Sequence, residues 1–175
     1  MLIGTLSLAA VLLLPRSIHA QDDKEKDILS ECDKAKSEFI KVDPSMSKLF
    51  EESYGYAIFP KAGKGGLIVG GGGGNGGVYE KGKEIGTAKM AQLSVGAQVG
   101  GQAFREVIFF ENEEALDRFK DNKVEFTSQM SAVAVKSGVS KNAKYTDGVA
   151  VFTQNINGLM AEATVGGQKF EYKAF

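Results

Sequence analysis

Lysines that flank a glycine-rich stretch are the residues of this sequence whose types and spacing first suggest chemistry. Residues 70–77 read GGGGGNGG, and five lysines against two glutamates between residues 61 and 89 give that segment a local charge of +3. Backbone amides of glycine, beside lysine ammonium groups, can hold an anionic headgroup. The candidate headgroup-binding residues are Lys61, Lys64, Gly65, Gly66, Gly74, Gly76, Lys81 and Lys83.

A plainer interpretation of the same stretch stays open. Fifteen of the 22 glycines fall between residues 63 and 101, so the glycine-rich character is regional. Glycine permits positive φ and close approach of backbones, and both are used in bent strands and tight hairpins. On this interpretation the glycines mark turns and bends of a sheet, and the lysines form a solvated face.

A nucleotide-binding loop is the alternative that the glycines suggest and the flanking residues disfavour. Gly72, Gly74 and Gly77 match the spacing G-x-G-x-x-G, but that fingerprint requires a helix after the loop, and residues 78–82 read as strand and turn. Residues 77–83 spell G-x-x-x-x-G-K, yet Glu84 stands where a phosphate loop needs Ser or Thr. The sequence predicts no nucleotide and no other cofactor.

Catalytic and metal chemistry have few residues to use. The chain has one histidine, His19, and one cysteine, Cys32, which excludes most metal sites and most histidine-dependent nucleophiles. A lone cysteine cannot form an internal disulfide, and we expect Cys32 to be a small apolar residue on a helix face. Residues 45–48 match S-x-x-K, a weak signal taken alone. We therefore predict that the protein is not an enzyme; an enzyme would need a Ser–Lys pair or a cofactor.

The composition indicates a globular protein with no strong electrostatic partner. The chain has 175 residues, with 43% hydrophobic and 25% charged residues, which suits one domain with a sizeable core. A formal net charge of -1 gives no overall attraction to nucleic acid. We therefore expect no nucleic-acid partner.

The amino-terminal residues resemble a secretory signal peptide. Residues 2–14 form an apolar run that is long enough for a signal peptide and shorter than the roughly 20 residues of a membrane-spanning helix. The prediction is a signal peptide over residues 1–20, cleaved near Ala20, and a secreted or periplasmic protein. An uncleaved anchor or a buried helix is the alternative.

Helical periodicity at the start and strand signals afterwards define the expected fold. Residues 22–42 read as an amphipathic helix that ends at Asp43 and Pro44, and Ser45 can cap a short second helix through residue 53. Strands follow, with a helix over residues 113–120 capped by Asn112. Strand signals cover residues 56–59, 66–70, 78–79, 89–99, 104–110, 126–135, 148–155, 159–165 and 169–172. The predicted fold class is α+β, with N-terminal helices packed on a strongly bent, mostly antiparallel, barrel-like sheet and one inserted helix.

Several segments together resemble the SYLF domain, a lipid-binding module of secreted bacterial proteins and of eukaryotic actin-patch and membrane-trafficking proteins. The segments are YGYAIFPKAGKGG at 54–66, GVYE at 77–80, SVGAQVGGQ at 94–102, IFF at 108–110, SAVA at 131–134, GVAVF at 148–152 and ATVGGQKF at 163–170. The resemblance covers residues 46–175, so the predicted organisation is a signal peptide at 1–20, an amphipathic helix at 21–45 and a SYLF-like domain at 46–175.

The resemblance implies binding to membrane phospholipids, and it brings no catalytic residues. In some relatives an amphipathic helix ahead of the domain touches the membrane, but residues 21–63 here carry seven lysines against ten acids. For a secreted protein we do not expect actin as a partner. The resulting hypothesis is a secreted or periplasmic, non-catalytic module that binds an anionic phospholipid or membrane surface. The alternative is a structural or protein-interaction domain of the cell envelope.

Overall fold

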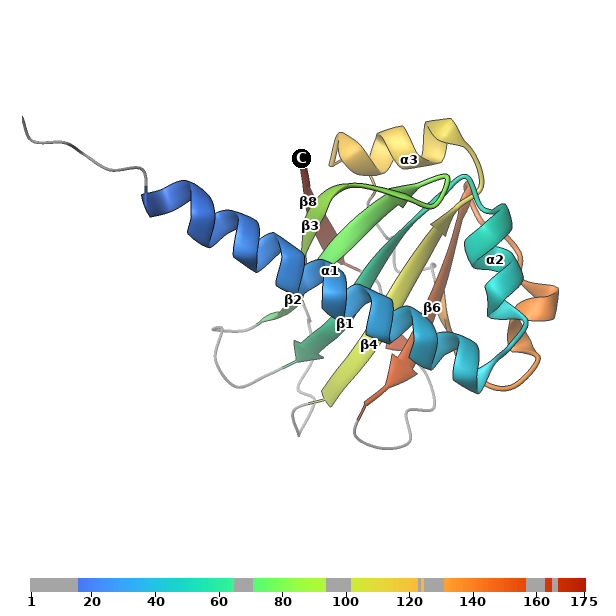
Figure 1. Cartoon of the computed structure of the whole chain (residues 1–175). Helices are drawn as coiled ribbons and strands as arrows, with labels where there is room; N and C mark the ends of the chain where they lie inside the picture. The colour runs from blue at the N-terminus through green and yellow to red at the C-terminus, as the bar shows by residue number, and fades with distance from the viewer. Residues whose placement is uncertain are drawn as a thin grey trace, which may run out of the picture.

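A curled sheet covered by helices forms the body of the protein (Figure 1). The computed structural model describes residues 16–64, 71–93, 102–122, 124, 131–156, 163–164 and 167–175. The helices are α1 (Arg16–Val42), α2 (Met46–Glu52), α3 (Glu113–Lys120) and the 3-10 helix η1 (Val139–Asn142). The strands are β1 (Gly55–Lys64), β2 (Gly71–Glu80), β3 (Lys83–Leu93), β4 (Gln102–Phe110), β5 (Ser131–Ala134), β6 (Val149–Asn155), β7 (Ala163–Thr164) and β8 (Gln168–Ala174).

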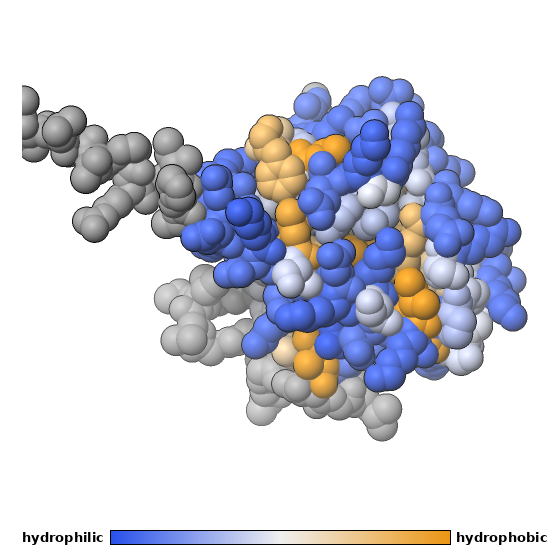
Figure 2. All heavy atoms as spheres, viewed as in Figure 1, coloured by the Kyte–Doolittle hydropathy of each residue, from blue (hydrophilic) through white to orange (hydrophobic). Residues whose placement is uncertain are grey.

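The strand order confirms the predicted α+β class. It is β7-β5-β6-β4-β1-β2-β3-β8, and each neighbouring pair is antiparallel except β5 with β6. Helix α1 crosses one face of the sheet, and α3 lies over one end of the strands (Figure 1). Figure 2 shows that this side of the protein, where α1 faces solvent, is mostly hydrophilic. The helical periodicity of α1 is confirmed, because Cys32, Ala35 and Phe39 are buried.

The sheet is strongly curled, as the predicted bend requires, but it is open. Gln168 on β8 donates from Nε2 to Oε2 of Glu106 on β4 at 3.0 Å, although three strands separate β8 from β4 in the sheet. In a flat sheet those strands would lie roughly 19 Å apart, so the sheet curls until its inner side chains meet. Among the described residues no backbone pairing joins β7 to β8, so the term barrel-like describes the curl and not a closed barrel.

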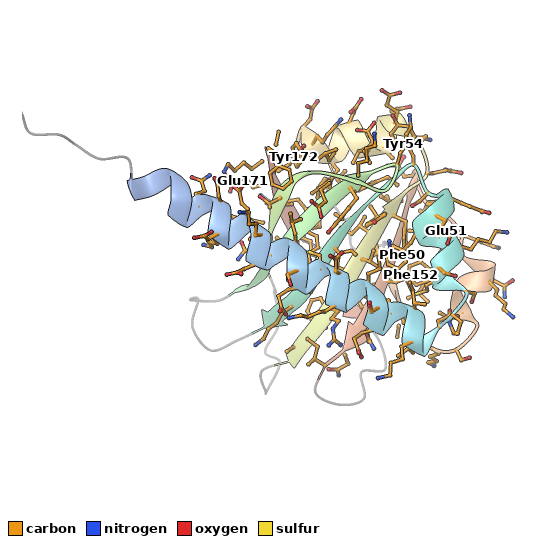
Figure 3. All side chains as sticks on the ribbon, in the orientation of Figure 1. Phe50, Glu51, Tyr54, Phe152, Glu171 and Tyr172 are labelled. Carbon is orange, nitrogen blue, oxygen red and sulfur yellow. The ribbon has the colours of Figure 1, made fainter. Side chains whose placement is uncertain are left out.

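Two apolar layers result from the curl. The inner layer lies inside the sheet and under α3, and it includes Phe59, Ile108 and Phe110. The outer layer lies between the sheet and helices α1 and α2. There Phe109 packs between Phe50 of α2, at 4.9 Å between ring centroids, and Phe152 of β6, at 5.9 Å. Figure 3 labels Phe50 on α2 and Phe152 on β6, the two residues that contact Phe109.

Several expected element boundaries need correction. Strand β1 does not close at Pro60 but runs on to Lys64, because Pro60 lies at a register shift where both neighbouring pairings are interrupted. The glycines at 71–77 form strand β2 and not a bend. Helix α1 begins at Arg16, earlier than residue 22. The expected strand at 66–70 lies outside the described residues.

The predicted helix caps differ in outcome. Asn112 caps α3 as expected, since its Oδ1 accepts from the amide of Ala115 at 3.0 Å. Ser45 precedes α2 but makes no side-chain capping bond, because its hydroxyl donates to Oδ1 of Asp43.

Asp43 connects the junction of α1 and α2 to a segment nearly one hundred residues later. It is fully buried, and its carboxylate accepts from the amides of Ser140 at 2.8 Å and Gly138 at 3.0 Å. Burial by itself would raise the pKa of Asp43, but the hydrogen bonds from Ser45, Ser140 and Gly138 outweigh it and hold the pKa well below its ordinary value.

Glu106 is a second buried carboxyl, and it lies inside the curl. It is 0% exposed; Oε2 accepts from Gln168, and Oε1 has no partner among the described residues. Burial raises the pKa of Glu106 to about 8, and the bond from Gln168 lowers it only in part. The folded protein therefore holds a neutral carboxyl at this position at neutral pH.

Changing Asp43 to Asn should destabilise the protein by about 2 kcal/mol, because an amide cannot accept all of these bonds and leaves a buried donor unpaired. Urea unfolding near neutral pH measures the loss, with the exposed Asp33→Asn as control. A variant D43N as stable as D33N would contradict the assigned role.

Changing Glu106 to Gln should remove a pH dependence of stability. The folded state keeps a proton that the unfolded state loses near pH 4.5, so the free energy of unfolding should fall as pH rises from about 4.5 to about 8 and then level off. The slope from one group is at most about 1.4 kcal/mol per pH unit. Urea unfolding across this range should show the slope in the wild type and in the exposed control E171Q, and not in E106Q.

Candidate functional site

A surface groove between α1 and the lower ends of β1 and β4 includes Lys61, one of the predicted lysines. Its volume is about 440 Å³. Three cationic side chains line it, one from each element: Lys34 from α1, Lys61 from β1 and Arg105 from β4. The other lining residues are Glu31, Ala35, Glu38, Pro60 and Ile156.

The acids in the groove are engaged with lysines of their own helix. Lys34 Nζ lies 2.6 Å from Glu31 Oε1, and Lys41 Nζ lies 3.8 Å from Glu38 Oε1. The bond from Lys34, and to a smaller extent the charge of Arg105, lowers the pKa of Glu31. These two glutamates offset part of the positive charge of the groove.

Lys61 and Arg105 keep donors for an anion. Lys61 is exposed, and within the described part of the chain it forms no ion pair. Arg105 makes one long hydrogen bond, from Nη1 to Gln154 Oε1 at 3.4 Å. A guanidinium has five donors in a planar fork that suits phosphate, so most of its donors are available.

The structure does not bring the four predicted lysines together. Strands β1 and β2 are antiparallel, with Gly55 opposite Glu80 and Lys64 opposite Gly72. Lys61 and Lys64 therefore lie at one end of the hairpin, and Lys81 and Lys83 at the other, separated by about six residues of strand or roughly 20 Å. Gly65 and Gly66 lie outside the described residues, as does the side chain of Lys64.

Acidic residues lie close to Tyr54, the residue that Lys81 contacts. Lys81 Nζ lies 4.8 Å from the centroid of the Tyr54 ring, and the Tyr54 hydroxyl donates to Glu80 at 2.9 Å. The bond to Glu80, then burial and the charges of Glu113 and Asp117, raise the pKa of Tyr54 to about 12. Figure 3 shows Tyr54 at the α3 end of the molecule. This end offers an anion less favourable surroundings than the groove.

Gly74 and Gly76 have structural reasons to be glycine. A Cβ on Gly74 would lie 2.6 Å from the carbonyl oxygen of Lys61. A Cβ on Gly76 would overlap the carbonyl oxygen of Ile58 and lie 2.7 Å from Cδ1 of Phe59. A side chain at either position would displace β1. Gly74 and Gly76, which the sequence suggests as headgroup ligands, therefore allow β1 and β2 to pack closely.

Cys32 is an inert core residue, as expected. It is 0% exposed; its Sγ accepts from the amide of Gly77 at 3.2 Å, and its thiol donates to the Ile58 carbonyl at 3.5 Å. Burial raises the pKa of the thiol to about 12, so almost no thiolate forms at neutral pH.

Other kinds of site have no support in the described residues. No group of three or more His, Cys, Asp or Glu in that part of the chain could hold a metal ion. The helices of the same part are too short or too polar for any of them to cross a membrane.

Lys34 and Arg105 line the groove but are not among the residues that the sequence suggests. Alternation along β4 places Arg105 on the same face as Val107 and Phe109, which pack toward α1. That signal gives the face of the sheet, but the position of α1 across β4 depends on the tertiary fold.

Replacing Gly76 with Ala should destabilise the protein by about 2 to 4 kcal/mol, because the new methyl group must push β1 away. The neighbouring Asn75→Ala, on an exposed position of the same strand, should change stability by less than about 0.5 kcal/mol. Thermal and urea unfolding compare the two. Normal stability with impaired ligand binding in G76A would instead favour a ligand role.

Comparison with known proteins agrees with the resemblance seen in the sequence. Residues 91–173 match the sequence model of the family described as "Ysc84: Las17-binding protein actin regulator". Beta cell expansion factor A from Aeromonas veronii is 31% identical over 127 residues, which cover 73% of this chain and 49% of that protein. The chain thus spans about half the length of the curated relative it matches. From this match and this relative, the chain belongs to the SYLF-domain (Ysc84) family.

Proposed function

We propose that this protein is a non-catalytic module, secreted or periplasmic, that binds anionic phospholipid. The observation that carries the proposal is the groove where Lys34, Lys61 and Arg105 come from three separate elements to one place. A phosphate headgroup is a ligand that such a set of cations recognises. The apolar run at residues 2–14 supports the proposed export, and for an exported chain we do not propose actin as a partner.

The groove suits a membrane surface better than a soluble phosphate pocket. It is open, Lys61 is exposed, and the two glutamates leave a net charge of only about +1 from its five ionised side chains. Each basic residue near an anionic surface contributes about 1 kcal/mol. We therefore expect weak, salt-sensitive binding that depends on the density of anionic lipid.

The test compares two double charge reversals that change the net charge equally. Lys61→Glu with Arg105→Glu alters the groove, and Lys81→Glu with Lys83→Glu alters the other end of the hairpin. Co-sedimentation with phosphatidylcholine vesicles of graded phosphatidylglycerol content measures binding. Loss of two cations alone corresponds to roughly 30-fold weaker binding, and the first variant also gains two acids, so it should lose at least that much and the second variant far less. Binding of the wild type should also weaken as salt is raised.

Urea unfolding of both variants checks that each keeps its fold. Equal losses in the two variants would mean that only net charge matters and would remove the groove from the proposal. Equal binding to neutral and anionic vesicles, or none, would contradict phospholipid-headgroup binding and favour a protein-interaction domain of the cell envelope.

A further inference from the structure

A second cavity lies between η1 and strand β6. In the sheet, β4 and β1 separate β6 from the glycine-rich strand β2. Its volume is about 460 Å³. Val133 of β5 and Val139 of η1 line it, together with Ala143 and the buried Phe152 of β6. It shares no lining residue with the basic groove.

Apolar surface is left exposed at this cavity. Val133 is 40% exposed, and among the described residues the only other large hydrophobic side chain with comparable exposure is Phe175 at the chain end. Val139 and Ala143 are half-buried. Water reaches the apolar walls of this cavity. Displacement of that water by an apolar group is favourable, because it removes apolar surface from contact with water.

The segment that forms the outer wall is cationic. Residues 136–146 contain three lysines, Lys136, Lys141 and Lys144, and no acid. All three are exposed, and Lys144 lines the cavity. The neighbouring Asp147 is engaged by Arg118, with Nη1 at 2.8 Å from Oδ2.

Two further acids act on this region. Glu111 and Glu52 contribute, after burial, to raising the pKa of Tyr145, the residue next to Lys144. Neither lines the cavity. The mouth therefore combines an apolar interior with a cationic edge, which is complementary to a molecule with an alkyl chain and one anionic group.

The size of the cavity limits the ligand to one chain. At the roughly 30 Å³ that a water molecule occupies in the liquid, a volume of 460 Å³ holds on the order of 15 non-hydrogen atoms. A medium-length alkyl chain with its carboxylate matches that number, whereas the two chains and headgroup of a phospholipid exceed it.

We propose that this cavity binds a free fatty acid, with the alkyl chain against Val133, Val139 and Phe152 and the carboxylate at Lys144. This binding is separate from the proposed binding of anionic phospholipid headgroups in the basic groove.

Dodecanoate is the probe for the test, used below the concentration at which it forms micelles. Isothermal titration calorimetry of the full chain should show saturable binding of one dodecanoate per chain. Lys144→Gln should weaken the affinity about fivefold to tenfold, because one charge-assisted contact is lost. Dodecanol, which lacks the charge, should bind the wild type more weakly by a similar factor. The control Lys169→Gln, exposed on β8, should bind dodecanoate as the wild type does.

Two blocking variants test the location. Val133→Phe and Ala143→Phe should each weaken dodecanoate binding more than tenfold by filling the cavity. Because Val133 is 40% exposed, V133F is expected to fold even if A143F is overpacked; thermal unfolding checks both. Undiminished binding in a folded blocking variant, equal affinity for dodecanol, or no saturable binding of dodecanoate would each overturn the proposal.

Vesicle binding separates this proposal from the preceding one. V133F should bind anionic vesicles as the wild type does, and the double variant K61E/R105E should bind dodecanoate as the wild type does. If V133F loses vesicle binding as well as dodecanoate binding, the cavity takes a chain of a membrane lipid and the assignment to free fatty acid is wrong.

Discussion

The absence of side chains at the centre of β2 is the constraint on which the rest of the structure depends. Gly74 and Gly76 let the backbone of β1 come so close that a methyl group at either position would overlap it. On the helix side, the amide of Gly77 donates to Cys32, so α1 also lies directly on this strand. Tight approach on both sides is what allows the sheet to curl with α1 fixed across it. The curl in turn brings β8 back to β4, where Gln168 meets Glu106.

The groove follows from the same packing. Because α1 is held against β2 and β1, its next turns pass over the lower end of β4, and Lys34 comes near Lys61 and Arg105. In the proposed function the glycines of β2 therefore position α1 and do not bind the ligand. The antiparallel register that they permit also carries Lys81 and Lys83 to the far end of the hairpin.

Buried polar groups then fix contacts that apolar packing leaves undetermined. Asp43 joins the α1–α2 junction to Gly138 and Ser140, and these bonds hold η1 and the segment after it against the helices. That segment forms the outer wall of the cavity at β6. Glu106 with Gln168 joins strands that are not neighbours in the sheet. Each link is directional, and each carries a cost if a partner is removed, so both select one arrangement of elements.

Local pattern in the sequence determined the element types: the buried face of α1 with Cys32 and Phe39, the cap at Asn112, and the antiparallel α+β class all depend on residues within a few positions of each other. The set of family segments identified the domain.

The sequence could not reveal that residues 71–77 form a strand, because glycine has no side chain to show a period of two. Nor could it reveal that Pro60 lies within β1 at a bulge. Of the lysines that the sequence suggested, Lys61 lines the groove, whereas Lys81 and Lys83 lie far from it. Lys34, Lys61 and Arg105 belong to elements that are distant in the sequence, and the same is true of Glu106 and Gln168. Only the tertiary structure brings such residues together, since their distance depends on strand register and helix position, which no local pattern contains.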